Sequence, residues 1–319
     1  MPIGELATFD EGDFQGTIDY SSSLKSIKLG MDNKEISYNF FAEKEPYKSY
    51  MIIGTETPNL LTKWRLWINN FSLTKEFRPN INLEYNSKYF NIHVFDISHF
   101  VKKGKNEFVI NSVTVEPITV NFINSLIFYN ISNFYTKFST KAGILMLKSS
   151  ERLMLKNFHK SYIILKNPNK SVLKIYGDGT LLSEIGDNKN SEEIEINENK
   201  EIDIIHEGQV KCPAFIYLHY TAKTESPKID ISVDGKVIDK GILLNIENCG
   251  EIDLDKLLVN IMLNGVTVHF KTFENVKTKS IIRYEIPMSS LLQKKGNLNI
   301  RVVGVKAGLR KVIDKEIER

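Results

Sequence analysis

Apolar and polar residues alternate with a period of two along almost the whole chain, and this pattern limits the fold more than any other feature. Segments such as Leu257–Leu263, Ser280–Ile286 and Asn297–Val303 are rich in β-branched residues and end at turn-forming residues. A period of two places every second side chain on the same face of an extended strand. No long stripe with the 3.6-residue period of an amphipathic helix interrupts the pattern, so strands do not alternate with helices. The sequence therefore predicts an all-β fold of antiparallel sheets.

The other segments with the same pattern extend the prediction over most of the chain. They are Tyr50–Ile53, Lys63–Ile68, Phe90–Phe95, Glu107–Val115, Ser125–Tyr129, Gly143–Leu147, Ser161–Leu165, Val172–Tyr176, Glu193–Ile196, Ile202–Ile205, Ala214–Tyr220, Lys228–Val233, Ile242–Glu247, Val266–Thr272 and Arg310–Ile317. Turn signals between them are Asn167-Pro168-Asn169, Gly177-Asp178-Gly179, Asp234-Gly235 and Asn264-Gly265.

A length of 319 residues predicts about two domains. The best boundary is the polar segment 221–227, which contains Pro227 and separates two predicted strands. We expect a jelly-roll-like β-sandwich over residues 1–224, either one elaborated domain, which we favour, or two smaller sandwiches divided near residue 135. Residues 225–319 have the length and strand number of an immunoglobulin-like β-sandwich.

Charge and composition exclude several classes of partner. The chain has 42 Lys and Arg against 39 Asp and Glu, a formal charge of +3, and this balance argues against a nucleic acid partner. No apolar run is long enough for a transmembrane segment, and the residues after Met1 do not form a signal peptide. The compartment stays open: the cell surface if a leader was removed, otherwise the cytoplasm. We expect Cys212 and Cys249 to be free thiols, because distant single cysteines seldom meet the geometry of a disulfide.

Two parts of the chain show a loose internal similarity. In each, a strand ends at Asn69-Asn70 or Asn264-Gly265, a short turn capped by Ser98 or Ser289 follows later, and Lys-Lys-Gly leads into another strand. The serine hydroxyl would cap free amides, and Gly104 or Gly296 would take positive φ. A duplication and two sandwiches that close the same corner in the same way both explain the similarity, and we favour the second.

The segment Val94–Phe108 resembles one found in galactose-binding-like jelly rolls, where an aliphatic-Asp-Val-Thr run leads through a turn to Gly-x-Asn. The matching residues are Asp96, Ser98, Gly104 and Asn106. The resemblance implies a jelly-roll fold and a structural role for this segment.

The segments Ile242–Gly250 and Leu258–Gly265 resemble the CARDB type of immunoglobulin-like module, which is related to cell adhesion. The opening segment Gly4–Gly16 is similar to the start of an uncharacterised family of archaeal surface proteins, in which a jelly-roll-like domain precedes a CARDB-like one. Together these resemblances imply surface assembly, adhesion or glycan binding.

Aromatic residues are the first candidates for a ligand site. Trp64 and Trp67 are three positions apart in a predicted strand, so their rings face opposite sides. An outward tryptophan can stack on a sugar ring, and Tyr85 and Tyr89 can extend such a platform. The alternative is that the rings are covered by other strands.

Carboxylates are the candidates for a metal site. The segment 193–204 predicts a hairpin in which Glu195 lies opposite Asp203, and a calcium ion would relieve the repulsion between them. The alternative is that solvent and nearby lysines do so. Calcium is the one cofactor that the sequence leaves open. A second acidic group, Asp10, Glu11 and Asp13, lacks the ligand pattern of an EF-hand, and we expect a solvated N-terminal loop there.

Motifs that mark enzymes are absent from the sequence. It has no Gly-x-Ser-x-Gly, phosphate-binding loop, dinucleotide fingerprint or zinc-ligand spacing among its six histidines. We therefore predict a non-enzymatic structural or adhesion protein that acts through protein partners or self-assembly of sandwich faces and edges. The first alternative is carbohydrate binding by exposed aromatic residues of the N-terminal domain. A glycoside hydrolase with carboxylates that only the fold brings together is the second.

Overall fold

The computed structural model describes residues 2–74, 78–113, 116–157, 159–197, 199–208, 212–238, 241–287, 297–307 and 309–317. These residues form strands, turns and irregular segments without a helix, so the all-β prediction is confirmed for them. In the same part of the chain, no helix has the length and apolarity to cross a membrane. The chain divides into two compact units, Met1–Glu225 and Ser226–Arg319, one residue beyond the predicted boundary.

The first sandwich of the N-terminal unit lies between residues 16 and 130 and consists of two antiparallel sheets. One contains, in spatial order, β2 (Gly16–Ser23), β11 (Ile118–Asn130), β5 (Lys48–Thr57), β9 (Lys88–Asp96) and β8 (Ile81–Tyr85), and the short strand β3 (Ile27–Leu29) also pairs with β11. The other contains β4 (Glu35–Ala42), β10 (Gly104–Ser112), β6 (Trp64–Ile68) and β7 (Phe71–Thr74).

The second sandwich contains the rest of the N-terminal unit. Its longer sheet has the order β1 (Ile3–Phe14), β12 (Tyr135–Leu147), β19 (Ala214–Glu225), β14 (Lys160–Lys166) and β17 (Glu192–Ile196). Its shorter sheet has the order β13 (Arg152–Lys156), β18 (Glu201–Glu207), β15 (Val172–Gly177) and β16 (Thr180–Ile185).

Both sandwiches have jelly-roll connectivity. In the first sandwich β2 and the short β3 pair with the last strand, β11, and β4 pairs with the last but one, β10. In the second, the first strand β12 pairs with the last, β19, and the second strand β13 pairs with the last but one, β18. The chain passes from the first jelly roll to the second between Asn130 and Tyr135. The N-terminal unit is thus one compact unit that contains two sandwiches, which meet near residue 135, with β1 added to the edge of the second.

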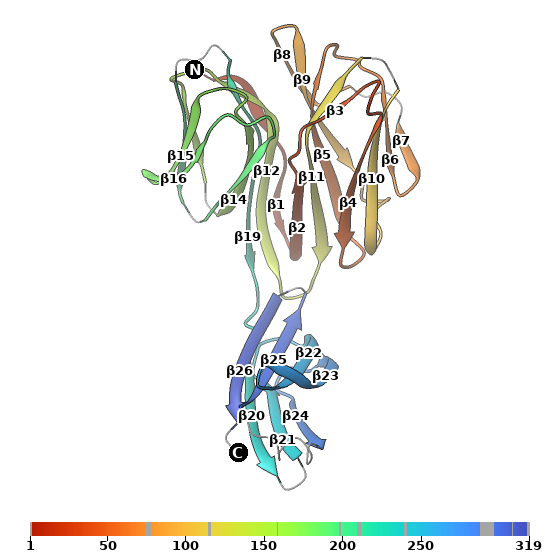
Figure 1. Ribbon diagram of the computed structural model, residues 1–319, viewed down its shortest axis with the longest axis vertical. Helices are drawn as coiled ribbons and strands as arrows, with labels where there is room; N and C mark the ends of the chain where they lie inside the picture. Colours follow the sequence, from red (N-terminus) through yellow and green to blue (C-terminus); the bar gives the residue numbers. More distant parts are fainter. Residues whose placement is uncertain are drawn as a thin grey trace. The chain divides into compact units, whose positions relative to one another are not determined.

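The two jelly rolls pack through their longer sheets, so that four sheets lie in layers (Figure 1). Large apolar and aromatic side chains fill the central layer, for example Phe122 and Phe128 from β11 against Ile144 from β12 and Tyr217 from β19. A separate apolar core lies inside the second jelly roll, between its longer and shorter sheets. Strands with apolar residues on both faces, such as β11, are explained by their position between two cores.

The C-terminal unit is a seven-strand sandwich in the described residues. One sheet has the order β20 (Ile231–Ile238), β21 (Gly241–Asn248) and β24 (Ile281–Pro287). The other has the order β23 (Val266–Val276), β22 (Leu254–Leu263), β25 (Leu298–Lys306) and β26 (Leu309–Ile317). The first, second and fifth strands share one sheet and the remaining four share the other, which is an immunoglobulin-like arrangement.

An Asn or Asp side chain closes the same corner in all three sandwiches. Asn69 N–H donates to Glu107 O at 2.9 Å, and Glu107 N–H donates back to Asn69 Oδ1 at 3.0 Å. Asp178 forms the same pair of bonds with Glu201 at 3.0 and 3.0 Å, and Asn264 forms it with Asn297 at 3.0 and 3.0 Å. All three turn residues have positive φ, which Asn and Asp tolerate better than most residues. This recurrence supports a common solution for the corner, and Ser289 and Gly296 lie outside the described residues.

The segment that resembles galactose-binding-like jelly rolls has a structural role. Asn106 is fully buried, and its amide bonds to Lys102, Gly104 and Asn69 hold the turn before β10. Gly104 has the expected positive φ of 101°. The predicted cap differs in detail, because Asp96 Oδ1 accepts the Ser98 amide while Ser98 Oγ accepts the amide of Ser49.

Three sequence expectations are wrong. The segment 193–204 is not a hairpin, because β17 pairs with β14 and β18 pairs with β13 and β15 in the other sheet. Asp234-Gly235 lies inside β20 rather than in a turn, and Gly235 leaves room for the side chain of Leu244, its partner on the neighbouring strand β21. The acidic residues after Phe9 belong to the strand β1 and not to a loop.

Candidate functional site

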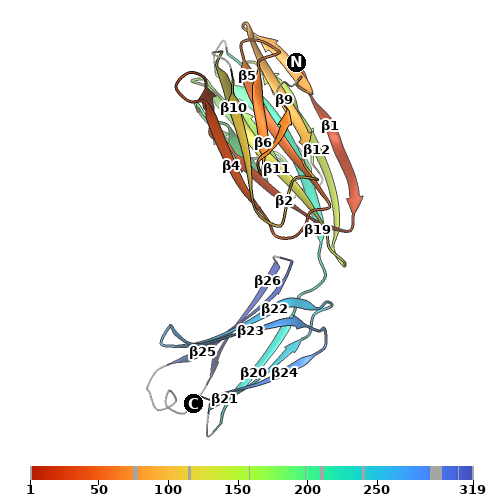
Figure 2. The ribbon, with the colours of Figure 1, turned by 90° about the vertical axis from the view of Figure 1, so that its right-hand side faces the viewer.

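The outer face of the longer sheet in the second jelly roll is covered over only part of its length. Strands β12 and β19 have 13 and 12 residues, whereas the strands of the covering sheet have 5 to 7. Figure 2 shows β1, β12 and β19 side by side and extended over their full length. The uncovered part of this face forms a hollow of about 940 Å³.

Polar side chains line the hollow in cross-strand rows. One row runs from Thr8 on β1 to Lys141 on β12 and His219 on β19. The next row contains Glu11, Ser139 and Thr221, and the third begins with Asp13 and Lys137. Lys156 and His159, at the connection from β13 to β14, also line it. Neighbours within a row are about 5 Å apart, because directly opposed residues of paired strands have that spacing.

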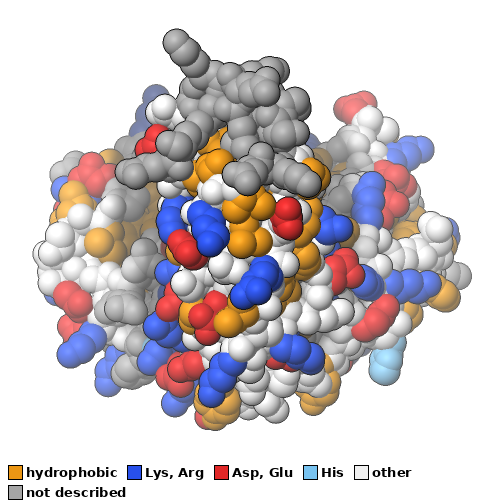
Figure 3. Space-filling view, turned by 90° about the horizontal axis from the view of Figure 1, so that it is seen from below, with side chains coloured by type: hydrophobic (Ala, Val, Ile, Leu, Met, Phe, Trp, Pro, Cys, Tyr) orange, Lys and Arg blue, Asp and Glu red, His pale blue; other side chains and the backbone are white. Residues whose placement is uncertain are grey.

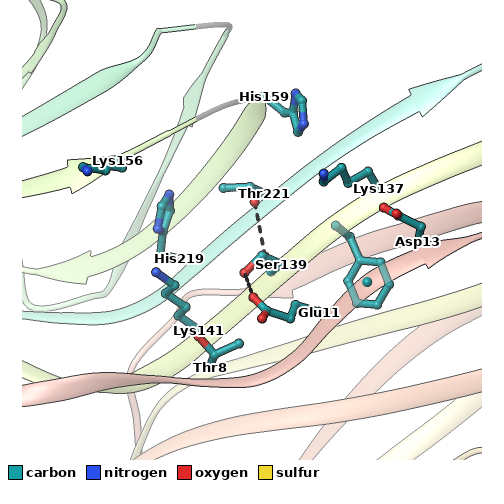
Figure 4. Close-up of a pocket in the computed structure, with 12 residues that line it drawn as sticks. Thr8, Glu11, Asp13, Lys137, Ser139, Lys141, Lys156, His159, His219 and Thr221 are labelled. Atoms are coloured by element: carbon teal, nitrogen blue, oxygen red, sulfur yellow. Dashed lines mark hydrogen bonds between the residues drawn. The ribbon is translucent and has the colours of Figure 1, made fainter.

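The polar groups of the hollow make few bonds to one another (Figure 4). Ser139 Oγ donates to Glu11 Oε2 and Thr221 Oγ1 donates to Ser139 O, both at 3.4 Å, which is long for a hydroxyl hydrogen bond. Among the residues that the structure describes, Lys137, Lys141, Lys156 and Glu11 form no ion pair. Charges of both signs therefore face the same space without neutralising each other.

His219 forms part of the wall of the hollow and is only 3% exposed. Burial lowers the pKa of its imidazole to about 4, and the nearby Lys141 ammonium adds to this effect. The ring is therefore neutral at pH 7. Its Nε2 is buried and has no hydrogen-bond partner among the described residues. A buried nitrogen without a partner costs about 1–3 kcal/mol, which a ligand that reached it would recover.

The acidic N-terminal group is divided between two faces of β1. Glu11 and Asp13 line the hollow, whereas Asp10 forms an ion pair with Lys48 at 2.5 Å. Sequence reasoning missed this site because Gly12 and four nearby acidic and polar residues hid the strand pattern. The spacing of Glu11 and Asp13, two positions apart, was the only available signal, and it required the partner strands to be recognised.

The aromatic candidates do not form one platform. Trp64 is 3% exposed and its ring contacts His93 at a centroid distance of 4.9 Å inside the first jelly roll. Trp67 lies on the opposite, outer face of β6 and is half-buried, as the odd spacing predicts. Tyr85 packs against the core between the two jelly rolls. Tyr89 lies on the same face of β9 as Asn91 and His93. This is the opposite face of the sheet from Tyr85.

The two carboxylates of the predicted calcium site lie in different sheets. Glu195 pairs with Lys160 at 2.7 Å, and this ammonium lowers the pKa of the Glu195 carboxyl. Asp203 receives two bonds from the Arg152 guanidinium, at 2.9 and 2.5 Å. Lys160 and Arg152 thus neutralise the two carboxylates, Glu195 and Asp203 respectively. No group of three or more metal-ligating side chains occurs among the residues that the structure describes.

The sequence contains three Asn-x-Ser sequons for N-glycosylation, at Asn70, Asn130 and Asn169, and they differ in accessibility. Asn70 and Asn130 are exposed, whereas Asn169 is 6% exposed and its amide donates to Asn167 Oδ1 and Pro213 O. The folded protein therefore does not present Asn169 for modification. Cys212 and Cys249 are both exposed free thiols.

No family model and no curated protein matches this sequence, so the resemblances to CARDB modules and archaeal surface proteins stay predictions. Solved structures that are similar include a putative β-galactosidase from Bacteroides fragilis, with 12% identity, a TM-score of 0.21, and coverage of 58% of this chain and 32% of that one. A β-glucuronidase from Ruminococcus gnavus has 7% identity and a TM-score of 0.21 over 56% of this chain and 35% of that one. The same enzyme with D-glucaro 1,5-lactone has 12% identity and a TM-score of 0.20 over 89% and 36%.

This chain spans about a third of the length of these enzymes. At such identities and TM-scores the likeness carries no argument about what the chain binds. The chemistry of the hollow follows from its own residues.

Proposed function

We propose that this protein acts by binding and not by catalysis, and that the hollow on β1, β12 and β19 holds a saccharide. The observation that carries the proposal is the set of donors and acceptors in the hollow that do not satisfy one another, with Lys137, Glu11 and Thr221 as examples. Sugar hydroxyl groups both donate and accept, so they suit a surface that presents both kinds of group. A volume of about 940 Å³ lies in the range of ligand sites in proteins.

The arrangement of carboxylates favours binding over glycoside hydrolysis. Hydrolysis uses two carboxyl groups on opposite sides of the scissile bond. Glu11 and Asp13 project from the same face of one strand, so both approach a ligand from the same side.

The test is a glycan array followed by calorimetric titration of the best ligand with the full chain. We expect the double variant Glu11→Gln/Thr221→Val to weaken binding at least tenfold, because it removes an acceptor and a hydroxyl from the middle row. Glu5→Gln, which makes the same change on β1 outside the hollow, should leave the affinity unchanged. Circular dichroism confirms folding of each variant.

The variant Trp67→Ala tests the alternative that the saccharide binds at the outer face of β6. If it abolishes binding while Glu11→Gln/Thr221→Val does not, the ligand binds at the outer face of β6 and the hollow is the wrong site. An array on which no glycan binds would overturn the proposal itself.

A second candidate function is self-assembly through the edge strand β23, as expected for a structural or adhesion protein. Strand β23 has 11 residues and pairs only with β22, and Val266 and Phe270 on it are 67% and 57% exposed. Two copies of such an edge can pair antiparallel with each other, because unpaired backbone groups accept a further strand. We expect a concentration-dependent dimer in analytical ultracentrifugation that Phe270→Lys disrupts. A monomer at all concentrations would eliminate this candidate.

A further inference from the structure

We infer that the saccharide held in the hollow is anionic, with carboxylate or sulfate groups that bind Lys137, Lys141 and Lys156. This inference rests on the proposed function and names the class of its ligand. It follows from the excess of lysines over carboxylates among the residues that line the hollow.

The three ammonium groups have no anionic partner among the described residues. Lys137 and Lys141 come from β12, and Lys156 comes from the end of β13 on another side of the hollow. Other lysines of this unit do pair with carboxylates, as Lys48 does with Asp10 and Lys160 with Glu195. An anionic ligand in the hollow would give Lys137, Lys141 and Lys156 the partner that they lack among the described residues.

The same hollow presents two carboxylates, those of Glu11 and Asp13. Ser139 donates to Glu11 at 3.4 Å. His219, next to Lys141, carries no charge at pH 7. Three lysines against two carboxylates (3 − 2) leave the hollow with a formal charge of +1.

The spacing of the lysines suits a chain of charged sugars. Lys137 and Lys141 lie on the same face of β12, four residues apart, which corresponds to about 13 Å along a strand. A saccharide that lies along β12 can place acidic groups at both positions while its hydroxyl groups bond to Ser139, Thr221 and Glu11 in the row between them. Acceptors such as Glu11 need hydroxyl donors, which a polymer with phosphate alone does not supply.

The surface argues against a general polyanion site. On the face shown in Figure 3, lysine and arginine side chains are interspersed with aspartate and glutamate side chains. Nucleic acid binding usually uses a continuous basic surface. The chain as a whole has a formal charge of only +3.

The experiment is calorimetric titration of the full chain with hexagalacturonate, a sulfated chondroitin hexasaccharide, neutral cellohexaose and a single-stranded oligonucleotide. We expect one of the acidic saccharides to bind at least tenfold more tightly than cellohexaose and the oligonucleotide. Raising the salt concentration from 50 to 300 mM should weaken that binding, because the contacts are partly ionic. The two acidic ligands distinguish carboxylate from sulfate recognition.

Matched double variants test the residues. Lys137→Gln/Lys141→Gln should weaken binding of the acidic saccharide at least tenfold, whereas Lys170→Gln/Lys189→Gln, with the same change of charge at exposed positions outside the hollow, should not. Equal or tighter binding of cellohexaose overturns the inference but leaves the proposed function standing. Binding of no saccharide overturns both, and tighter binding of the oligonucleotide overturns the inference in favour of a nucleic acid site.

Discussion

At the scale of single residues, polar side chains with several hydrogen bonds hold the corners of the sandwiches. Asn69 combines positive φ with three side-chain bonds, to Phe100 O, Asn106 Oδ1 and the Glu107 amide. Asparagine thus both tolerates the positive φ of this turn and supplies the side-chain amide that holds the neighbouring strands. Asp178 and Asn264 occupy the equivalent turns of the other two sandwiches, and their side chains likewise accept an amide hydrogen from a neighbouring strand.

Asn69→Ala should destabilise the N-terminal unit by about 2 kcal/mol, because it loses these bonds and places alanine at positive φ. Asn69→Gly relieves the backbone strain and keeps only the loss of the bonds, so it should cost less. Urea denaturation of both variants measures the two contributions. Equal stability of Asn69→Ala and the wild type would contradict the role of this side chain.

Buried histidines make the stability of the N-terminal unit dependent on pH. Burial lowers the pKa of His219 to about 4 and that of His93 to about 3. Each ring takes up a proton in the unfolded chain near pH 6.5 but not in the folded one until much lower pH. Stability is therefore lost as the pH falls from 6.5 towards 4, by about 2 kcal/mol for each histidine between pH 7 and 5.

The measurement is urea denaturation at pH 7 and at pH 5 for the wild type and for His219→Gln. Because glutamine does not titrate, the variant should lose about 2 kcal/mol less than the wild type over this interval. If the free energy of unfolding falls by the same amount from pH 7 to pH 5 in the variant and in the wild type, His219 does not couple folding to protonation.

At the scale of elements, a small residue on one strand makes room for a large side chain on the neighbouring strand of the same sheet. Gly54 on β5 faces Phe122 on β11, and a side-chain carbon at residue 54 would lie 2.2 Å from that ring. Packing therefore requires glycine here, because Gly54 does not have a positive φ that would favour glycine for conformational reasons.

Gly54→Ala should destabilise the protein by about 1–3 kcal/mol, because overpacking displaces Phe122 in the central core. Gly186→Ala is the matched control, since a side chain there meets no atom within 4 Å. Thermal unfolding followed by circular dichroism compares the two. A Gly54→Ala variant as stable as Gly186→Ala would mean that the Phe122 ring can move aside without cost.

At the scale of the whole molecule, the two jelly rolls depend on each other and the C-terminal unit does not depend on them for its core. Aromatic side chains cross between the jelly rolls: Tyr20 stacks on Tyr162 and Tyr220, and its hydroxyl donates to Glu193 at 2.5 Å. The C-terminal unit encloses its own apolar cluster, with Ile242, Ile261 and Ile300 fully buried.

We expect the fragment 226–319 to fold alone and unfold cooperatively in urea. The fragment 16–130 should aggregate or stay partly unfolded, because separation exposes the large side chains of β11 and β5 that the second jelly roll covers. Nuclear magnetic resonance spectra and size-exclusion chromatography distinguish these outcomes. A soluble, well-folded fragment 16–130 would contradict the mutual dependence.

The sequence by itself determined the class of the fold, the boundary between the units and many of the strands and tight turns. These properties depend on neighbouring residues: alternation specifies a strand, and Asn-Asn or Asn-Gly specifies a turn with positive φ. Among the segments it missed, β1 is an edge strand in which charged and polar residues weaken the alternation. The edge strand β4 was missed although Ile36, Tyr38 and Phe40 alternate with polar residues.

Only the tertiary structure decided which sheet each strand joins, and with it the candidate site. Segment 193–204 has a hairpin pattern, yet the jelly-roll path sends β17 and β18 to different sheets and separates Glu195 from Asp203. The hollow likewise combines Glu11, Lys141, Lys156 and His219, which are far apart in the chain. Local pattern carries no information about such pairings, because strand order follows from how complete sheets bury their apolar faces against one another.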